Sequence, residues 1–156
     1  MFITGVGLLS GNRDKEGFSF SSFNKQSSQK TVTVNNNEIS VEIANTEAQR
    51  SKGLSQRESL ANDHGMLFVF TAKDIKPPFW MKGMKIPIDI IWINDSEIVQ
   101  IDDNIQPPDK TTPESELVLF LPMNPIDYVL EVPAGYSEKS NIKVGDKINL
   151  TKALGQ

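Results

Sequence analysis

The sequence contains no cysteine, which excludes disulfides, zinc–thiolate sites and a cysteine nucleophile. Its single histidine, His64, excludes any site built from several imidazoles. There is no run of about 18 apolar residues, so we expect no membrane-spanning segment. The net charge is −4 and the pI is near 5.0, whereas nucleic-acid phosphates require a basic face. We therefore expect no nucleic-acid partner.

The chain is long enough for one domain and a tail. It has 156 residues, of which 38% are hydrophobic and 23% are charged, as in an ordinary globular protein. Residues 1–9 form a short apolar run without a preceding basic residue, and residues 10–29 are rich in Ser, Asn, Gln and Lys. We predict a flexible N-terminal tail over residues 1–29 and a single β-rich domain over residues 30–152.

The apolar run at the start of the chain has two interpretations. Followed by a polar spacer, it resembles the remnant of an export signal, which favours an extracytoplasmic location, either secreted or tethered. The run is short and lacks the charged region of a signal peptide, so a disordered N-terminus is the other interpretation.

Short alternating segments dominate residues 30–150. Residues 31–34 and 38–44 are β-branched or alternate apolar with polar residues, which predicts a hairpin around three asparagines. Residues 88–93 are almost wholly apolar, which indicates a central strand covered on both sides, and residues 97–101 complete a second hairpin. Residues 65–70, 128–132 and 147–150 are further strand candidates, and the proline-containing residues 102–116 predict a long loop.

Helical signals are few. Thr46 and Gln49 have the spacing of a capping box, so a helix is expected from Thr46 to Lys52, ending at Gly53. One or two helical turns are expected within residues 134–141. The predicted fold is mainly β, shading into α+β: a small curved or closed antiparallel sheet with one or two short helices.

Three groups of segments resemble a known family. They are residues 41–54 with 57–60 and 65–70, residues 79–82 with 86–90, and residues 128–135 with 142–146. In order and spacing, residues 38–150 resemble the family called domain of unknown function 192. Two positions differ: Gly83 replaces the asparagine usual after Trp-Met-Lys, and Ser55 replaces the methionine usual after Gly-Leu. The family has no established activity, so the resemblance implies a fold and a set of positions, not a reaction.

Trp80 and Lys82 form the strongest candidate for a binding surface. They lie between Pro78 and Pro87, and an aromatic face beside a cation could bind a sugar ring or an acid. The alternative is that Phe79 and Trp80 close one end of the sheet as part of the core.

Asp89 interrupts an apolar strand, so its carboxylate must be paired, hydrogen-bonded or exposed at a cavity mouth. It could bind a ligand near Lys82, with Arg50 and Arg57 completing a polar wall. Alternatively, Asp89 accepts backbone N–H groups or pairs with one of these arginines. Glu131 alternates with apolar residues and is predicted to face water.

Three functions remain open at this stage. We expect a small-molecule or carbohydrate binding or accessory domain without catalytic residues, cofactor or metal, and acting as a monomer. Its ligand-binding candidates are Trp80, Lys82, Asp89, Arg50 and Arg57. A hydrolase using Asp89 with Glu131 or Asp102 is the first alternative. A structural or protein-interaction module that uses the proline loop is the second.

Overall fold

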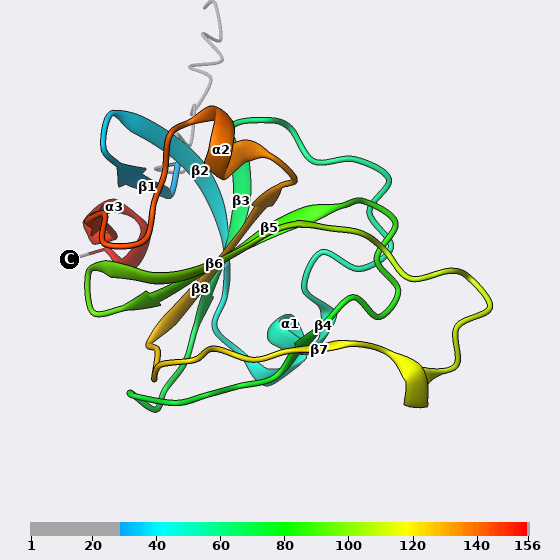
Figure 1. Ribbon diagram of the computed structural model, residues 1–156. Helices are drawn as coiled ribbons and strands as arrows, with labels where there is room; N and C mark the ends of the chain where they lie inside the picture. Colours follow the sequence, from blue (N-terminus) through cyan, green and yellow to red (C-terminus); the bar gives the residue numbers. More distant parts are fainter. Residues whose placement is uncertain (1–28, 156) are drawn as a thin grey trace, which may run out of the picture.

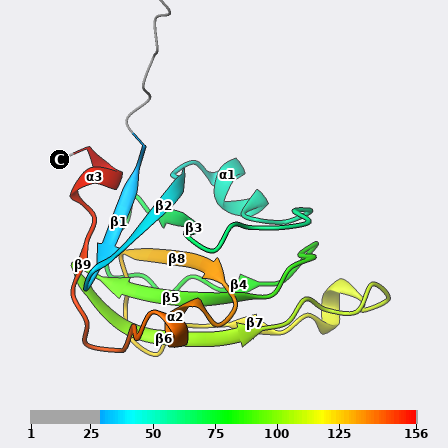
Figure 2. The ribbon, with the colours of Figure 1, turned by 90° about the horizontal axis from the view of Figure 1, so that it is seen from above.

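A seven-stranded sheet organises residues 29–155, the part of the chain that the computed structural model describes (Figure 1). In spatial order its strands are β6 (Glu97–Ile105), β5 (Ile88–Asn94), β8 (Tyr128–Pro133), β3 (His64–Val69), β2 (Asn37–Ala44), β1 (Thr31–Val34) and β9 (Ile148–Asn149). The sheet curls into a half-barrel, and Figure 2 shows β1 and β2 turning away from β5, β6 and β8. The predicted mainly β fold is confirmed. The expected tail lies outside the described residues, except Gln29.

Both predicted hairpins are present. β1 pairs with β2, and β5 pairs with β6, each in antiparallel register. β2 and β3, by contrast, are parallel neighbours, the only parallel pair within residues 29–155. Parallel neighbours need a long crossover connection. Residues 45–63, which include helix α1 (Glu47–Lys52), form this connection. Because β2 and β3 are not joined by a tight turn, the chain between them has room to form α1 beside the sheet.

Short elements flank the sheet on its two sides. β4 (Phe79–Trp80) and β7 (Leu119–Phe120) form a separate two-stranded ribbon, preceded by the 3-10 turn η1 (Glu114–Glu116). Figure 1 shows this ribbon and α1 on one side, with α2 (Tyr136–Lys139) and α3 (Thr151–Leu154) on the other. β6 continues to Ile105, so the predicted loop begins later than expected. Within the described residues, no helix is long and apolar enough to cross a membrane.

Because side chains alternate along each strand, the two faces of the sheet form two cores. One face places Ile91, Leu130 and Val132 among the residues packed near α3. The other places Ile90 and Trp92 against the α1 and β4 side. β5 is buried along both faces, as its continuous apolar run predicts. The second face borders a cavity beside α1 and β4.

Candidate functional site

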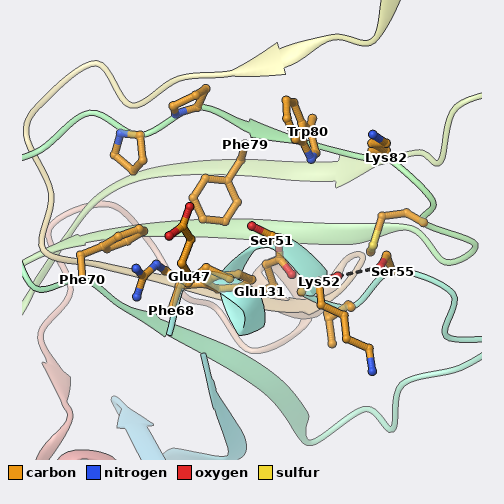
Figure 3. A pocket seen from close by; sticks show the side chains of 16 residues that line it. Glu47, Ser51, Lys52, Ser55, Phe68, Phe70, Phe79, Trp80, Lys82 and Glu131 are labelled. Atoms are coloured by element: carbon orange, nitrogen blue, oxygen red, sulfur yellow. Dashed lines mark hydrogen bonds between the residues drawn. The ribbon is translucent and has the colours of Figure 1, made fainter. Parts of the chain in front are cut away.

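A cavity of about 220 Å³ lies between α1, β3 and β4, and is called the α1–β4 cavity below (Figure 3). It combines an aromatic wall with a polar rim. Its lining residues are Glu47, Arg50, Ser51, Lys52, Gly53, Leu54, Ser55, Phe68, Phe70, Pro77, Pro78, Phe79, Trp80, Lys82, Met84 and Glu131. The volume is below the roughly 300–1,000 Å³ typical of pockets for drug-sized ligands. The cavity therefore suits a smaller molecule.

Phe79 organises the aromatic wall. Its ring packs edge-to-face against the rings of Phe68, Phe70 and Trp92. The distances between ring centroids are 5.0, 6.5 and 5.4 Å, respectively. Because neighbouring residues of β4 point in opposite directions, Trp80 faces outward and is 47% exposed. The wall therefore has a packed interior and one accessible indole at its edge (Figure 3).

Helix α1 supplies the polar rim. The predicted capping box is present: Gln49 N–H donates to Thr46 Oγ1 at 3.2 Å, and Thr46 N–H donates to Gln49 Oε1 at 3.1 Å. The guanidinium of Arg50 lies 5.4 Å from the ring centre of Phe70 and donates to the carbonyl of Val69 at 2.9 Å. This bond fixes Arg50 at the cavity while leaving its remaining N–H donors for other partners.

Lys82 lies at the other end of the cavity, where its ammonium is 6.0 Å from the ring centre of Trp80 and 2.6 Å from Glu114. The next residue, Gly83, has a left-handed φ of 68°. Its carbonyl accepts hydrogen bonds from the backbone N–H and side-chain amide of Gln56. A Cβ at position 83 would lie 2.9 Å from that amide nitrogen, so any larger residue requires Gln56 to move.

Glu131 is the buried acid of the cavity. It lies on β8 between Met66 of β3 and Ile90 of β5, and is only 6% exposed. Among the described residues nothing hydrogen-bonds to its buried Oε2. Burial raises the pKa of Glu131 to about 8, because a carboxylate in apolar surroundings loses its hydration. At neutral pH most of the population is therefore protonated and offers an O–H donor.

The prediction that Glu131 faces water is wrong. Its face of the sheet is covered by α1 and β4. The alternation along β8 therefore separates two buried faces, not a buried face from a solvent-exposed one. Val129, two residues earlier on the same face, is also fully buried. Val129 was a sign in the sequence that this face is buried, but the charge of Glu131 led to the opposite prediction.

The structure divides the five predicted ligand-binding residues. Trp80, Lys82 and Arg50 line the α1–β4 cavity, whereas Asp89 and Arg57 do not. Arg57 forms a two-bond ion pair with Glu42, at 2.5 and 2.7 Å.

The carboxylate of Asp89 is fully buried and accepts three backbone N–H groups. They belong to Asn104 at 2.8 Å, Gly135 at 2.9 Å and Ser137 at 2.9 Å. Asp89 thus joins β6 to the turn between β8 and α2, which is the structural alternative considered for it.

The carboxylates considered for hydrolysis do not assemble. Asp89 pairs in register with Val132, while Glu131 pairs with Ile90, so the two acids point to opposite faces of the sheet. Asp102 accepts hydrogen bonds from the indole N–H of Trp92 at 2.7 Å and from the amide of Gln100. The second carboxylate that shares the cavity with Glu131 is instead Glu47.

Comparison with known proteins agrees with the sequence resemblance. Residues 30–150 match the domain-of-unknown-function 192 family, described as "Uncharacterized ACR". A protein from Sinorhizobium meliloti 1021, proposed to be a transcription regulator, has a similar structure with a TM-score of 0.69 at 29% identity; the match covers 78% of this chain and 92% of that one. A protein of unknown function from Novosphingobium aromaticivorans DSM 12444 has a TM-score of 0.68 at 31% identity, covering 76% and 83%. No curated protein matches the chain.

Proposed function

The chain belongs to the domain-of-unknown-function 192 family, and from the geometry of its cavity we propose that it binds a small organic molecule in the α1–β4 cavity. The domain is proposed to act as a binding or accessory module, with the ligand seated between the aromatic wall and α1. A sugar ring or a small acid are the two ligand classes that an aromatic face beside cations suggests.

The observation that supports this proposal most strongly is the buried Oε2 of Glu131, which has no hydrogen-bond partner within residues 29–155. A buried polar group without a hydrogen bond costs roughly 1–3 kcal/mol, so the fold is less stable with Glu131 than with an apolar residue there. Such groups concentrate at functional sites, where a ligand supplies the missing partner. Glu131 also lines the cavity, so a ligand seated there is next to it.

The surroundings of the acid add a second argument. Phe68, Phe70 and Phe79 are held by edge-to-face contacts, so they need no reordering when a ligand arrives. Trp80 is half exposed at the edge of the same wall, where it can cover one side of a ring. A mostly apolar cavity with few converging polar groups is the usual form of a ligand site.

A thermal-shift screen with metabolite-sized sugars and acids tests the proposal. A binder present at 100 times its Kd stabilises the native state by about 2.7 kcal/mol and raises Tm. Trp80→Ala should abolish the shift. Leu121→Ala removes another exposed apolar side chain outside the cavity and should leave the shift unchanged. A screen without any hit, or hits unaffected by Trp80→Ala, would place binding elsewhere.

A hydrolase is the second candidate, favoured by one observation: two carboxylates, Glu131 and Glu47, line one cavity. A buried acid with a pKa near 8 is a suitable general acid at neutral pH, and an exposed carboxylate is a suitable base. Turnover of a bound sugar by the wild type that is lost in Glu131→Gln and Glu47→Gln would favour this candidate over simple binding.

A protein-contact role also has an observation in its favour. Val118, Leu119, Leu121 and Met123 follow the proline loop and are all more than half exposed. Exposed apolar side chains gathered in one segment are typical of interaction surfaces. This candidate predicts that charged substitutions at Leu121 and Met123 abolish a partner contact without affecting the thermal-shift response.

A further inference from the structure

The α1–β4 cavity is cationic although the chain as a whole is acidic. Arg50, Lys52 and Lys82 line it, against Glu47 and the predominantly neutral Glu131, whereas the net charge of the chain is −4. Within residues 29–155, neither Arg50 nor Lys52 forms an ion pair with a carboxylate. Lys82 is paired only with Glu114, which does not line the cavity. The local charge therefore attracts anions and repels cations.

The buried acid points to the same class of ligand. Because Glu131 is mostly protonated at neutral pH, it does not neutralise the cations around the cavity. Its O–H needs an acceptor, and an anionic oxygen is the strongest acceptor available. A cationic ligand would instead have to displace the proton from Glu131 and lie beside Arg50.

From these contacts we propose that the ligand is a small carboxylate with a flat apolar body. One carboxylate oxygen accepts the hydrogen of Glu131, the negative charge faces Arg50, and the body lies along the aromatic wall. The proposal rests on the binding function proposed above and adds the charge of the ligand. A body of the size of a single ring fits the volume of about 220 Å³.

The proposal predicts how binding depends on pH. Only the protonated form of Glu131 donates to the carboxylate, and its pKa is about 8. Affinity should be constant between the pKa of the ligand carboxyl and about pH 8, and should fall about tenfold per pH unit above the pKa of free Glu131 until the acid also titrates in the complex. Glu131→Gln keeps an N–H donor in the same place and does not titrate. It should bind the same carboxylate without this pH dependence.

Benzoate, benzyl alcohol and benzylammonium share a ring and differ in charge, so they test the proposal on the full chain by NMR titration. Benzoate should bind at least tenfold more tightly than benzyl alcohol, and benzylammonium most weakly. Arg50→Gln should weaken benzoate binding severalfold. Lys139→Gln, which removes a cation from α2 outside the cavity, should not.

The failures of the two proposals are distinguishable. Tighter binding of benzylammonium, with release of a proton, would overturn the anion assignment and leave ligand binding in this cavity intact. The same holds if none of the three probes binds while the broad screen yields a Trp80-dependent hit. If the screen also fails, both proposals fail. Equal weakening by Lys139→Gln would show a general charge effect and would likewise overturn the assignment.

Discussion

Asp89 and Glu131 lie on the neighbouring strands β5 and β8, displaced by one residue in register, and both are buried. Asp89 accepts three backbone N–H groups from two separate segments. Glu131 has an oxygen with no hydrogen bond from the described residues. Asp89 connects parts of the fold, because backbone N–H groups of β6 and of the turn before α2 donate to its carboxylate. Glu131 lines a cavity, as the proposed ligand-binding role requires.

Asp127 reinforces the structural side of this comparison. It accepts the backbone N–H groups of Asp74 and Asp95 and the ammonium of Lys73. Although burial opposes it, these donors hold the pKa of Asp127 below its usual value. Burial alone therefore does not distinguish Glu131 from the other acids of this sheet; the lack of donors from the described residues does.

The largest effect is expected from Asp89→Asn, which replaces one acceptor oxygen by an amide. One backbone N–H group then faces a donor in the protein interior, so the free energy of unfolding should fall by about 3 kcal/mol. Urea denaturation measures the change. Asp103→Asn, at an exposed carboxylate on the neighbouring strand β6, is the matched control and should be nearly neutral. A loss below about 1 kcal/mol would contradict the structural role of Asp89.

The stability of the wild type should fall between pH 6 and pH 8 because of Glu131. Its pKa is raised from 4.5 unfolded to about 8 folded, so the contribution to stability is complete below 4.5 and is lost as pH rises through 8. The expected loss is about 2 kcal/mol over this interval. Carboxyls with lowered pKa values, such as Asp127 and Asp146, destabilise the fold only at lower pH. Glu131→Gln should flatten the profile, and an unchanged slope in this variant would assign the effect to another group.

Glu131→Met should stabilise the protein at pH 7 by about 1 kcal/mol, because it replaces an unpartnered buried acid by an apolar side chain of similar length. The same variant should lose the ligand response in the thermal-shift assay. A gain in stability with a loss of binding is the expected signature of a functional group. Destabilisation by more than 1 kcal/mol would show that the fold uses Glu131 after all.

Arg57→Gln should have the smallest effect. Its ion pair with Glu42 is partly exposed, and such pairs contribute about 0.2–1 kcal/mol. The free energy of unfolding should therefore change by less than about 1 kcal/mol, and ligand binding should be unaffected, in contrast to Arg50→Gln. Loss of ligand response in Arg57→Gln would extend the site beyond the α1–β4 cavity.

Local patterns in the sequence were sufficient for much of the fold. The β1–β2 and β5–β6 hairpins follow from alternation and turn residues that are close in the chain. The capping box at Thr46 sets the start of α1 through contacts within four residues. Both depend on short-range geometry, so they could be predicted without knowing the rest of the structure. Trp80 and Lys82 were predicted from their place between Pro78 and Pro87, and Arg50 as part of a polar wall. All three line the α1–β4 cavity.

The pairing of distant strands was decided by the tertiary structure alone. The parallel β2–β3 neighbours and the position of β8 between β3 and β5 bring residues from three parts of the chain around Glu131. Alternation tells which residues share a face, but not whether that face meets water or another layer. Asp89 and Glu131 were both acids within apolar strands in the sequence. The elements that cover the two faces distinguish them, because they place three backbone donors around Asp89 and a cavity beside Glu131.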